Sequence, residues 1–154
     1  MTSYLLLARH GKAESGSDDF TRRLTKEGHD HVLRVASHLK RAGIRVDVIE
    51  HSGLTRAAET AEVFAQMLDA PAFRGEGLTA DADPAPLAQR LLAGDDQRIM
   101  LVSHAPLLPR LASYLLVGDE GHELLHLGTG TVACLSLDAG SWRVEWMVSP
   151  AIAV

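Results

Sequence analysis

The stretch LLLARHG at residues 5–11 is an apolar run that stops abruptly at an arginine, a histidine and a glycine. A short apolar run that ends at a polar, glycine-containing loop is typical of a strand buried on both faces of a sheet. We therefore expect a strand over Tyr4–Ala8, with Arg9 and His10 at its carboxyl end. Gly11 has no Cβ, so the backbone can turn sharply or approach closely beside His10.

Helices and further strands alternate along the rest of the chain. Apolar residues at helical spacing, helped by caps such as Thr25 and Asp83-Pro84, predict helices over 25–42, 54–68, 83–94 and 106–118. Apolar or alternating runs predict strands over 45–50, 99–102, 131–137 and 142–148. This order predicts an α/β three-layer sandwich, with a mostly parallel sheet, helices on both faces and closing antiparallel strands. Without repeats or linkers, we expect one domain over residues 1–154.

Composition excludes several classes of protein. The formal net charge is −5, which argues against general nucleic-acid binding because phosphate backbones demand a basic face. The single cysteine, Cys134, cannot form an internal disulfide, and we expect it to be a small buried core residue. The first apolar run is too short for a signal peptide or a membrane span, so we expect a cytoplasmic protein with no membrane partner.

Reactive and phosphate-binding side chains follow three of the expected strands, and parallel strands open onto a common crevice at their carboxyl ends. They are Arg9-His10, His51-Ser52 with Arg56 a turn later, and Ser103-His104. The fork of arginine binds two oxygens and stays charged, which suits a transferring phosphoryl group. A neutral imidazole can act as the nucleophile. We therefore predict a phosphoryl-transfer site, and we expect His51, which alternates with the buried face of its strand, to be structural.

Motifs spread over essentially the whole chain resemble one known family. They are RHG at 9–11, RRLT at 22–25, SGLTRAAET at 52–60, VSHAPL at 102–107 and WMVSP at 146–150. Together they resemble the histidine phosphatase superfamily, which includes phosphoglycerate mutase, and most closely its compact SixA-type phosphohistidine phosphatases. The resemblance implies a phosphoglycerate mutase-like fold and a metal-independent hydrolase without a cofactor.

The resemblance also implies a role for each matching residue. His10 corresponds to the nucleophile that becomes phosphorylated, and His104 to the second histidine of the pocket. Arg9 and Arg56 correspond to phosphate clamps, and Arg22 to an arginine that reaches the pocket from a loop.

Two positions depart from the family pattern, which usually has proline where this chain has Arg23 and Gly53. We expect these departures to change the stiffness of the loops rather than the chemistry.

The stretch between the second and third expected helices bears on the substrate. Many family members keep a carboxylic acid there to protonate an alkoxide leaving group, and this chain has Gly77 where a glutamate might stand. Glu76, Asp81 and Asp83 are nearby, without an assignment to any of them. Because an imidazolium has a pKa of about 6.5, imidazole leaves without much help. This favours phosphohistidine in a phosphotransfer signalling protein, with small phosphomonoesters as the open alternative.

Two further hypotheses belong to other classes. Residues 122–126 read HELLH, a zinc-protease pattern that requires a stable helix. Glycines at 118, 121, 128 and 130 bracket this segment, and no third ligand follows it, which makes a coincidental match in a loop the better interpretation. A phosphate-binding module without catalysis is the other minor alternative.

Overall fold

Strand β1 (Ser3–Arg9) lies inside a six-stranded sheet in the computed structural model, which describes residues 2–94 and 96–153. The order of the strands across the sheet is β3-β2-β4-β1-β5-β6. The other strands are β2 (Val48–His51), β3 (Ala72–Arg74), β4 (Arg98–Ser103), β5 (Val132–Asp138) and β6 (Ser141–Val148). Strands β1, β2, β3 and β4 are mutually parallel, whereas β5 pairs antiparallel with both β1 and β6. The expected α/β sheet with closing antiparallel strands is confirmed.

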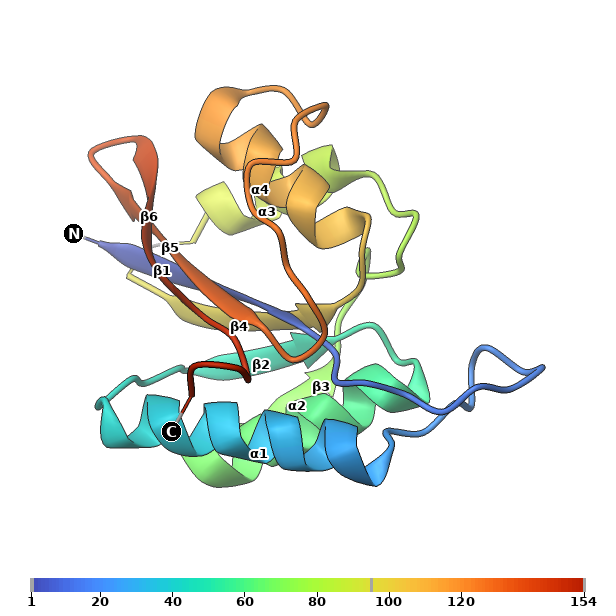
Figure 1. Cartoon of the computed structure of the whole chain (residues 1–154). Helices are drawn as coiled ribbons and strands as arrows, with labels where there is room; N and C mark the ends of the chain where they lie inside the picture. The colour runs from blue at the N-terminus through green and yellow to red at the C-terminus, as the bar shows by residue number, and fades with distance from the viewer. Residues whose placement is uncertain (1, 95, 154) are drawn as a thin grey trace.

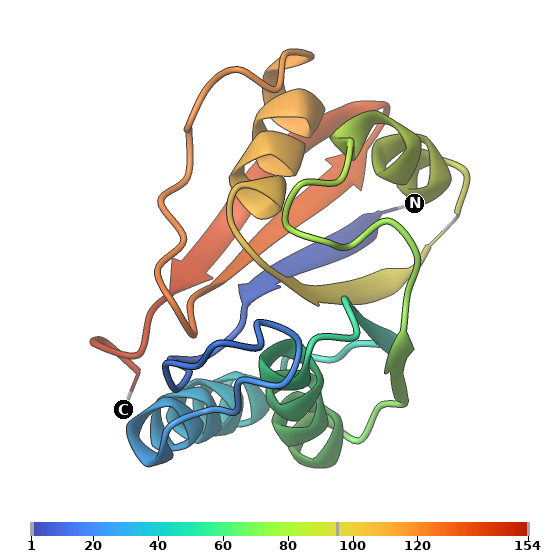
Figure 2. The ribbon, with the colours of Figure 1, turned by 90° about the vertical axis from the view of Figure 1, so that its right-hand side faces the viewer.

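In the described part of the chain, two pairs of helices cover the two faces of this sheet (Figure 1). Helices α1 (Lys26–Arg41) and α2 (Thr55–Leu68) lie on one face, and α3 (Pro84–Leu92) and α4 (Leu107–Val117) on the other, as the rotated view in Figure 2 also shows. Successive residues of β1 pack alternately into the two hydrophobic cores on either side of the sheet. Leu6 and Ala8 belong to the α1/α2 core, while Leu5 and Leu7 belong to the α3/α4 core. This alternation explains why a continuous apolar run forms the strand.

The helix ends follow the local signals in the sequence. The Thr25 hydroxyl accepts a hydrogen bond from the Gly28 N–H, and the Asp83 carboxylate accepts one from the Ala85 N–H. Helix α4 ends at Gly118, whose φ of 77° lies in the left-handed region that favours glycine. These caps confirm the expected boundaries to within a residue or two.

The sequence-based expectation missed β3 and placed β2 too early. Strand β3 lies at the edge of the sheet, paired with β2, and its three residues are too few to carry a periodicity of their own. The strand expected over 45–50 is Val48–His51 instead, because its pairing with β4 begins where Val48 lies opposite Ile99.

Two composition-based expectations concern the core and membranes. Cys134 is buried in the α1/α2 core, and burial raises the pKa of its thiol to about 12, which suits a core residue rather than a nucleophile. Among the helices of residues 2–94 and 96–153, none combines the length and the apolar character needed to cross a bilayer.

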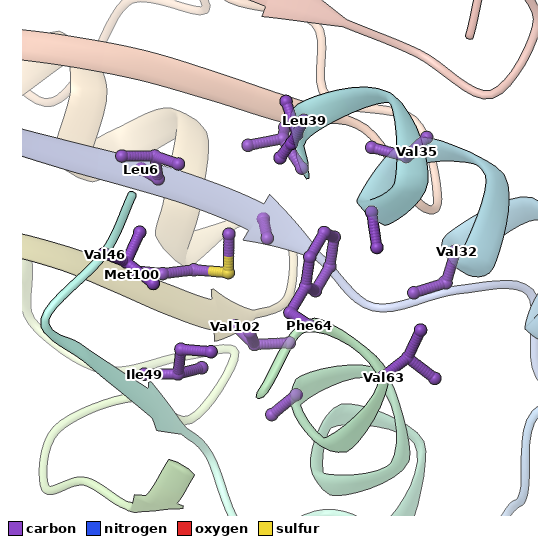
Figure 3. Close-up of a cluster of buried hydrophobic side chains, with 14 of the residues drawn as sticks. Leu6, Val32, Val35, Leu39, Val46, Ile49, Val63, Phe64, Met100 and Val102 are labelled. Carbon is purple, nitrogen blue, oxygen red and sulfur yellow. The ribbon is translucent and has the colours of Figure 1, made fainter. Parts of the chain in front are cut away.

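Phe64 of α2 is a large side chain at the centre of the α1/α2 core. Figure 3 shows its ring among side chains from α1 and from β1 and β4, and the ring is fully buried. Its truncation would leave a cavity that the surrounding close-packed side chains cannot fill.

We predict that Phe64→Ala lowers the free energy of unfolding by about 3–5 kcal/mol, as measured by urea denaturation. Phe73→Ala is the matched control, because Phe73 lies on edge strand β3 and is 49% exposed. We expect this control to cost less than about 1 kcal/mol. Equal losses for the two variants would contradict the assignment of Phe64 to the core.

Candidate active site

The register of three neighbouring strands brings the predicted site together. Arg9 of β1 lies opposite Ser103 of β4, and His51 of β2 lies opposite Val102 of β4. The residues that follow, His10, Ser52 and His104, therefore leave the sheet side by side. The backbone N–H of His10 donates to the Ser103 carbonyl at 3.1 Å, and the rings of His10 and His104 lie with their centroids 4.9 Å apart.

Both rings border one cavity of about 340 Å³. Its lining contains all five residues that the sequence analysis placed in the site, namely Arg9, His10, Arg22, Arg56 and His104. The lining also contains Lys12 and Thr129, which the sequence analysis did not single out. Lys12 lies two residues after His10, so its nearness to the motif was an available signal. Thr129 lies in the loop after α4, where no local pattern distinguishes it.

His10 is held in a defined tautomer. Its Nδ1 lies 2.7 Å from the carbonyl oxygen of Gly11. A carbonyl oxygen only accepts hydrogen bonds, so Nδ1 carries the proton and Nε2 keeps its lone pair. The Arg56 Nε–H points to this nitrogen at 3.4 Å. Nε2 is therefore the nitrogen of His10 that is able to act as a nucleophile.

Gly11 allows this turn to pack against helix α1. A Cβ on residue 11 would lie 2.7 Å from Cγ2 of Val32, closer than side chains tolerate. The Gly11 N–H donates to Thr60 Oγ1 at 3.0 Å, and the Thr60 hydroxyl donates to the carbonyl of Arg56. The turn that carries His10 is thus joined to the helix that carries Arg56.

His104 and Arg9 each have a buried nitrogen that makes no hydrogen bond to the described residues. Nε2 of His104 lies 2.6 Å from Ser52 Oγ, and an Arg9 Nη1–H donates to the carbonyl of Leu127 at 3.0 Å. Nδ1 of His104 and Nε of Arg9 are buried and find no hydrogen-bond partner among the described residues. Unpaired buried nitrogens beside a cavity are typical of a site that receives a polar ligand.

Both positions that depart from the family pattern are accommodated. Gly53 has a φ of +91°, which proline cannot adopt because its ring holds φ near −65°. The chain therefore turns into α2 through a glycine conformation, and Arg56 in the first turn still borders the cavity. Arg23 pairs with Glu59 on α2, and its neighbour Arg22 also borders the cavity.

Burial sets the protonation of the two histidines. It lowers the pKa of His10 from 6.5 to about 4, with Arg56 and Arg9 adding to the effect and the hydrogen bond to Gly11 opposing it. Burial also lowers the pKa of His104 from 6.5 to about 3, with further contributions from His10 and Arg56. Both imidazoles are therefore neutral near pH 7, whereas the arginines around them are charged.

The other candidates of the sequence analysis lie outside this cavity. Glu76 and Asp83 border a separate hollow beside α3, and Asp81 borders neither. His51 is half-buried, and its Nδ1 accepts a hydrogen bond from the Gly53 N–H at 3.1 Å, which agrees with a structural role.

The HELLH segment lies in the loop between α4 and β5 and not on a helix. His122 contacts Asp119, and His126 contacts Glu123. The zinc-protease hypothesis requires both histidines on one helix face, so this geometry contradicts it.

Comparisons with known proteins agree with the fold and with the motifs. The family model of the histidine phosphatase superfamily (branch 1) matches residues 5–79. An uncharacterized protein of Picosynechococcus is 32% identical over 149 residues, which cover 92% of this chain and 88% of that protein. The structure of a protein histidine phosphatase SixA complexed with tungstate superposes with a TM-score of 0.86 at 27% identity, covering 96% and 97% of the two chains. A phosphoglycerate mutase from Plasmodium falciparum shares the fold with a TM-score of 0.72 at 22% identity, covering 94% and 89%.

The lowered histidine pKa values predict a stability that depends on pH. As pH falls below 6.5, His10 and His104 bind protons in the unfolded chain but stay neutral in the folded state, because their pKa values are lower there. We predict that the free energy of unfolding falls as pH is lowered from 6.5 toward about 4, and that His104→Gln makes this fall less steep. Urea denaturation across this range measures it. His126→Gln, at a side chain 86% exposed, is the control and should keep the wild-type slope. Equal slopes for wild type and His104→Gln would contradict the prediction.

Proposed function

We propose that this chain, which belongs to the histidine phosphatase superfamily, hydrolyses phosphohistidine through a covalent intermediate on His10. The observation that carries the proposal is the meeting of two neutral imidazoles and three arginines around one cavity. The substrate side chain belongs to a phosphorylated protein, such as a histidine phosphotransfer domain of a signalling relay.

The reaction takes two displacements at phosphorus. In the first, the lone pair of His10 Nε2 forms a bond to phosphorus while the substrate's phosphorus–nitrogen bond breaks. The other nitrogen of the substrate ring takes a proton from solvent before this bond breaks, so the electron pair stays on a ring that leaves as neutral imidazole. In the second, a water oxygen attacks phosphorus and the bond to Nε2 breaks. The proton of the water passes to phosphate or solvent, and His10 returns to its neutral form.

The arginines and His104 hold the phosphoryl oxygens in this scheme. A transferring phosphoryl group spreads its negative charge over three oxygens, so positioning and charge do most of the catalytic work. The guanidinium groups of Arg9, Arg22 and Arg56 bring the positive charge. Nε of Arg9 and Nδ1 of His104 have no hydrogen-bond partner among the described residues. A phosphoryl oxygen would accept a hydrogen bond from Nε of Arg9, and from Nδ1 of His104 when that nitrogen carries a proton.

The lining of the cavity supports an imidazole leaving group. Among residues 2–94 and 96–153, the residues that border the cavity include no aspartate or glutamate. An alkoxide leaves poorly without an acid, whereas an imidazole leaves readily because its conjugate acid has a pKa of about 6.5. Ala80 borders the cavity in the segment where many family members keep their acid. This favours phosphohistidine over small phosphomonoesters.

We predict that His10→Ala lowers kcat/KM by at least about 10⁴-fold and abolishes trapping of a radiolabelled phosphoenzyme, because the nucleophile is gone. His126→Ala, at an exposed histidine, should leave both unchanged. EDTA should leave the wild-type rate unchanged, and a loss of activity would indicate metal chemistry. Normal turnover by His10→Ala would remove this residue from the mechanism.

A series of leaving groups tests the substrate. We predict that kcat/KM decreases from a phosphohistidine protein to an aryl phosphate and is lowest for an alkyl phosphate, because alkoxide is the leaving group most in need of an acid. Steady-state release of phosphate measures all three. Alkyl phosphates hydrolysed as fast as the phosphohistidine protein would overturn the substrate proposal and leave the role of His10 standing.

A further inference from the structure

We infer that Asp19 is a positioning residue whose carboxylate holds Arg22 and Arg56 together as one phosphate-binding pair. The inference rests on the proposed phosphatase function, and it assigns a part of that site that neither the motifs nor the family resemblance identified.

One carboxylate oxygen of Asp19 bridges the two arginines. Oδ1 lies 3.0 Å from Nη2 of Arg22 and 3.4 Å from Nη2 of Arg56. The main-chain oxygen of Asp19 also accepts a hydrogen bond from Nη1 of Arg56 at 2.7 Å. Asp19 thus contacts Arg56 through its side chain and its backbone, and Arg22 through its side chain.

The two guanidinium groups need such a bridge. Like charges close together repel, and a carboxylate that contacts both adds two attractions that offset this repulsion. Arg56 is anchored on helix α2 and its side chain is only 7% exposed. Arg22 lies on the loop between β1 and α1, and its other hydrogen bond runs to the Glu14 carbonyl at 3.4 Å. The ion pair with Asp19 is the shorter of these two contacts of Arg22, so it favours the position of Arg22 at the cavity.

Asp19 leaves the reacting side of Arg56 open. Its oxygens take up the Nη1–Nη2 end of the guanidinium fork, while Nε points to Nε2 of His10. The side chain of Asp19 is 64% exposed and does not border the cavity. A phosphoryl group at His10 can thus contact Arg56 without displacing Asp19. Asp19 therefore positions Arg56 and does not compete with the phosphate for it.

The backbone of the loop is fixed independently of this carboxylate. The Thr55 N–H donates to the Phe20 carbonyl at 3.0 Å and seats the loop on the start of α2. The Asp18 carboxylate accepts a hydrogen bond from the Phe20 N–H at 3.0 Å. Asp19→Asn should therefore keep the loop in place and remove the ionic bridge alone. Charge also stays on Asp19 near pH 7, because Arg56 above all, and then Arg22, lowers the pKa of its carboxyl group.

Tungstate binding, measured by calorimetry, tests the inference without requiring turnover. We expect Asp19→Asn to weaken tungstate binding about three- to tenfold, with a matching rise in KM and a smaller change in kcat. Asp18→Asn is the matched control, because it removes the same charge from the same loop and contacts neither arginine. Long-range electrostatics alone would strengthen anion binding in both variants. Wild-type or tighter binding by Asp19→Asn would overturn the inference and identify Asp19 as a competitor.

A double-mutant cycle separates positioning from a general structural effect. In the Arg22→Ala background the bridge is already broken, so Asp19→Asn should cost much less there than in the wild type. Fully additive effects would contradict the bridge.

Melting temperatures of Asp19→Asn and Asp18→Asn should match, since both side chains lie in an exposed loop. If His10→Ala keeps full activity while Asp19→Asn loses tungstate affinity, the proposed mechanism is wrong and the bridge stands. If His10→Ala is inactive while Asp19→Asn binds tungstate as the wild type does, the mechanism stands and the bridge is wrong.

Discussion

The register between β1 and β4 is the constraint on which the rest of this site depends. Arg9 lies opposite Ser103, so the two histidines that follow leave the sheet next to one another. The core enforces this pairing, because alternate residues of both strands belong to different hydrophobic layers. A slip of one residue would place leucines on the wrong faces and would also separate the two imidazoles. The same strand register therefore packs the core and places the two histidines side by side.

Electrostatics sets what this geometry can receive. Burial keeps both imidazoles neutral, while three arginines border the same cavity. Concentrated positive charge with unpaired buried nitrogens is costly unless an anion completes it. Under the proposed function a phosphoryl group would supply the negative charge in the cavity, while the carboxylate of Asp19 pairs with Arg22 and Arg56 outside the cavity lining. The site therefore suits an anion, and Nε2 of His10 keeps its lone pair beside the cavity.

Backbone features bring these side chains within reach. Gly11 lets the turn after β1 lie against α1, and Gly53 turns the chain into α2 with a positive φ that proline cannot adopt. The hydrogen bonds from Gly11 to Thr60 and from Thr60 to Arg56 join the two segments. Main-chain geometry therefore places Arg56 beside His10 even where the chain departs from the usual family pattern.

Local patterns in the sequence determined the order of helices and strands, the caps at Thr25, Asp83 and Gly118, and the side chains at the strand ends, because each depends on a few neighbouring residues. The resemblance added Arg22 from its loop. Only the tertiary structure decided the remainder. Strand β3 exists through its pairing with β2, and Asp19 matters through a contact with an arginine 37 residues away. The tautomer of His10, the partner of His104 and the low pKa values of both follow from distances and burial. No short stretch of sequence encodes these properties, since they arise when segments remote along the chain exclude water together.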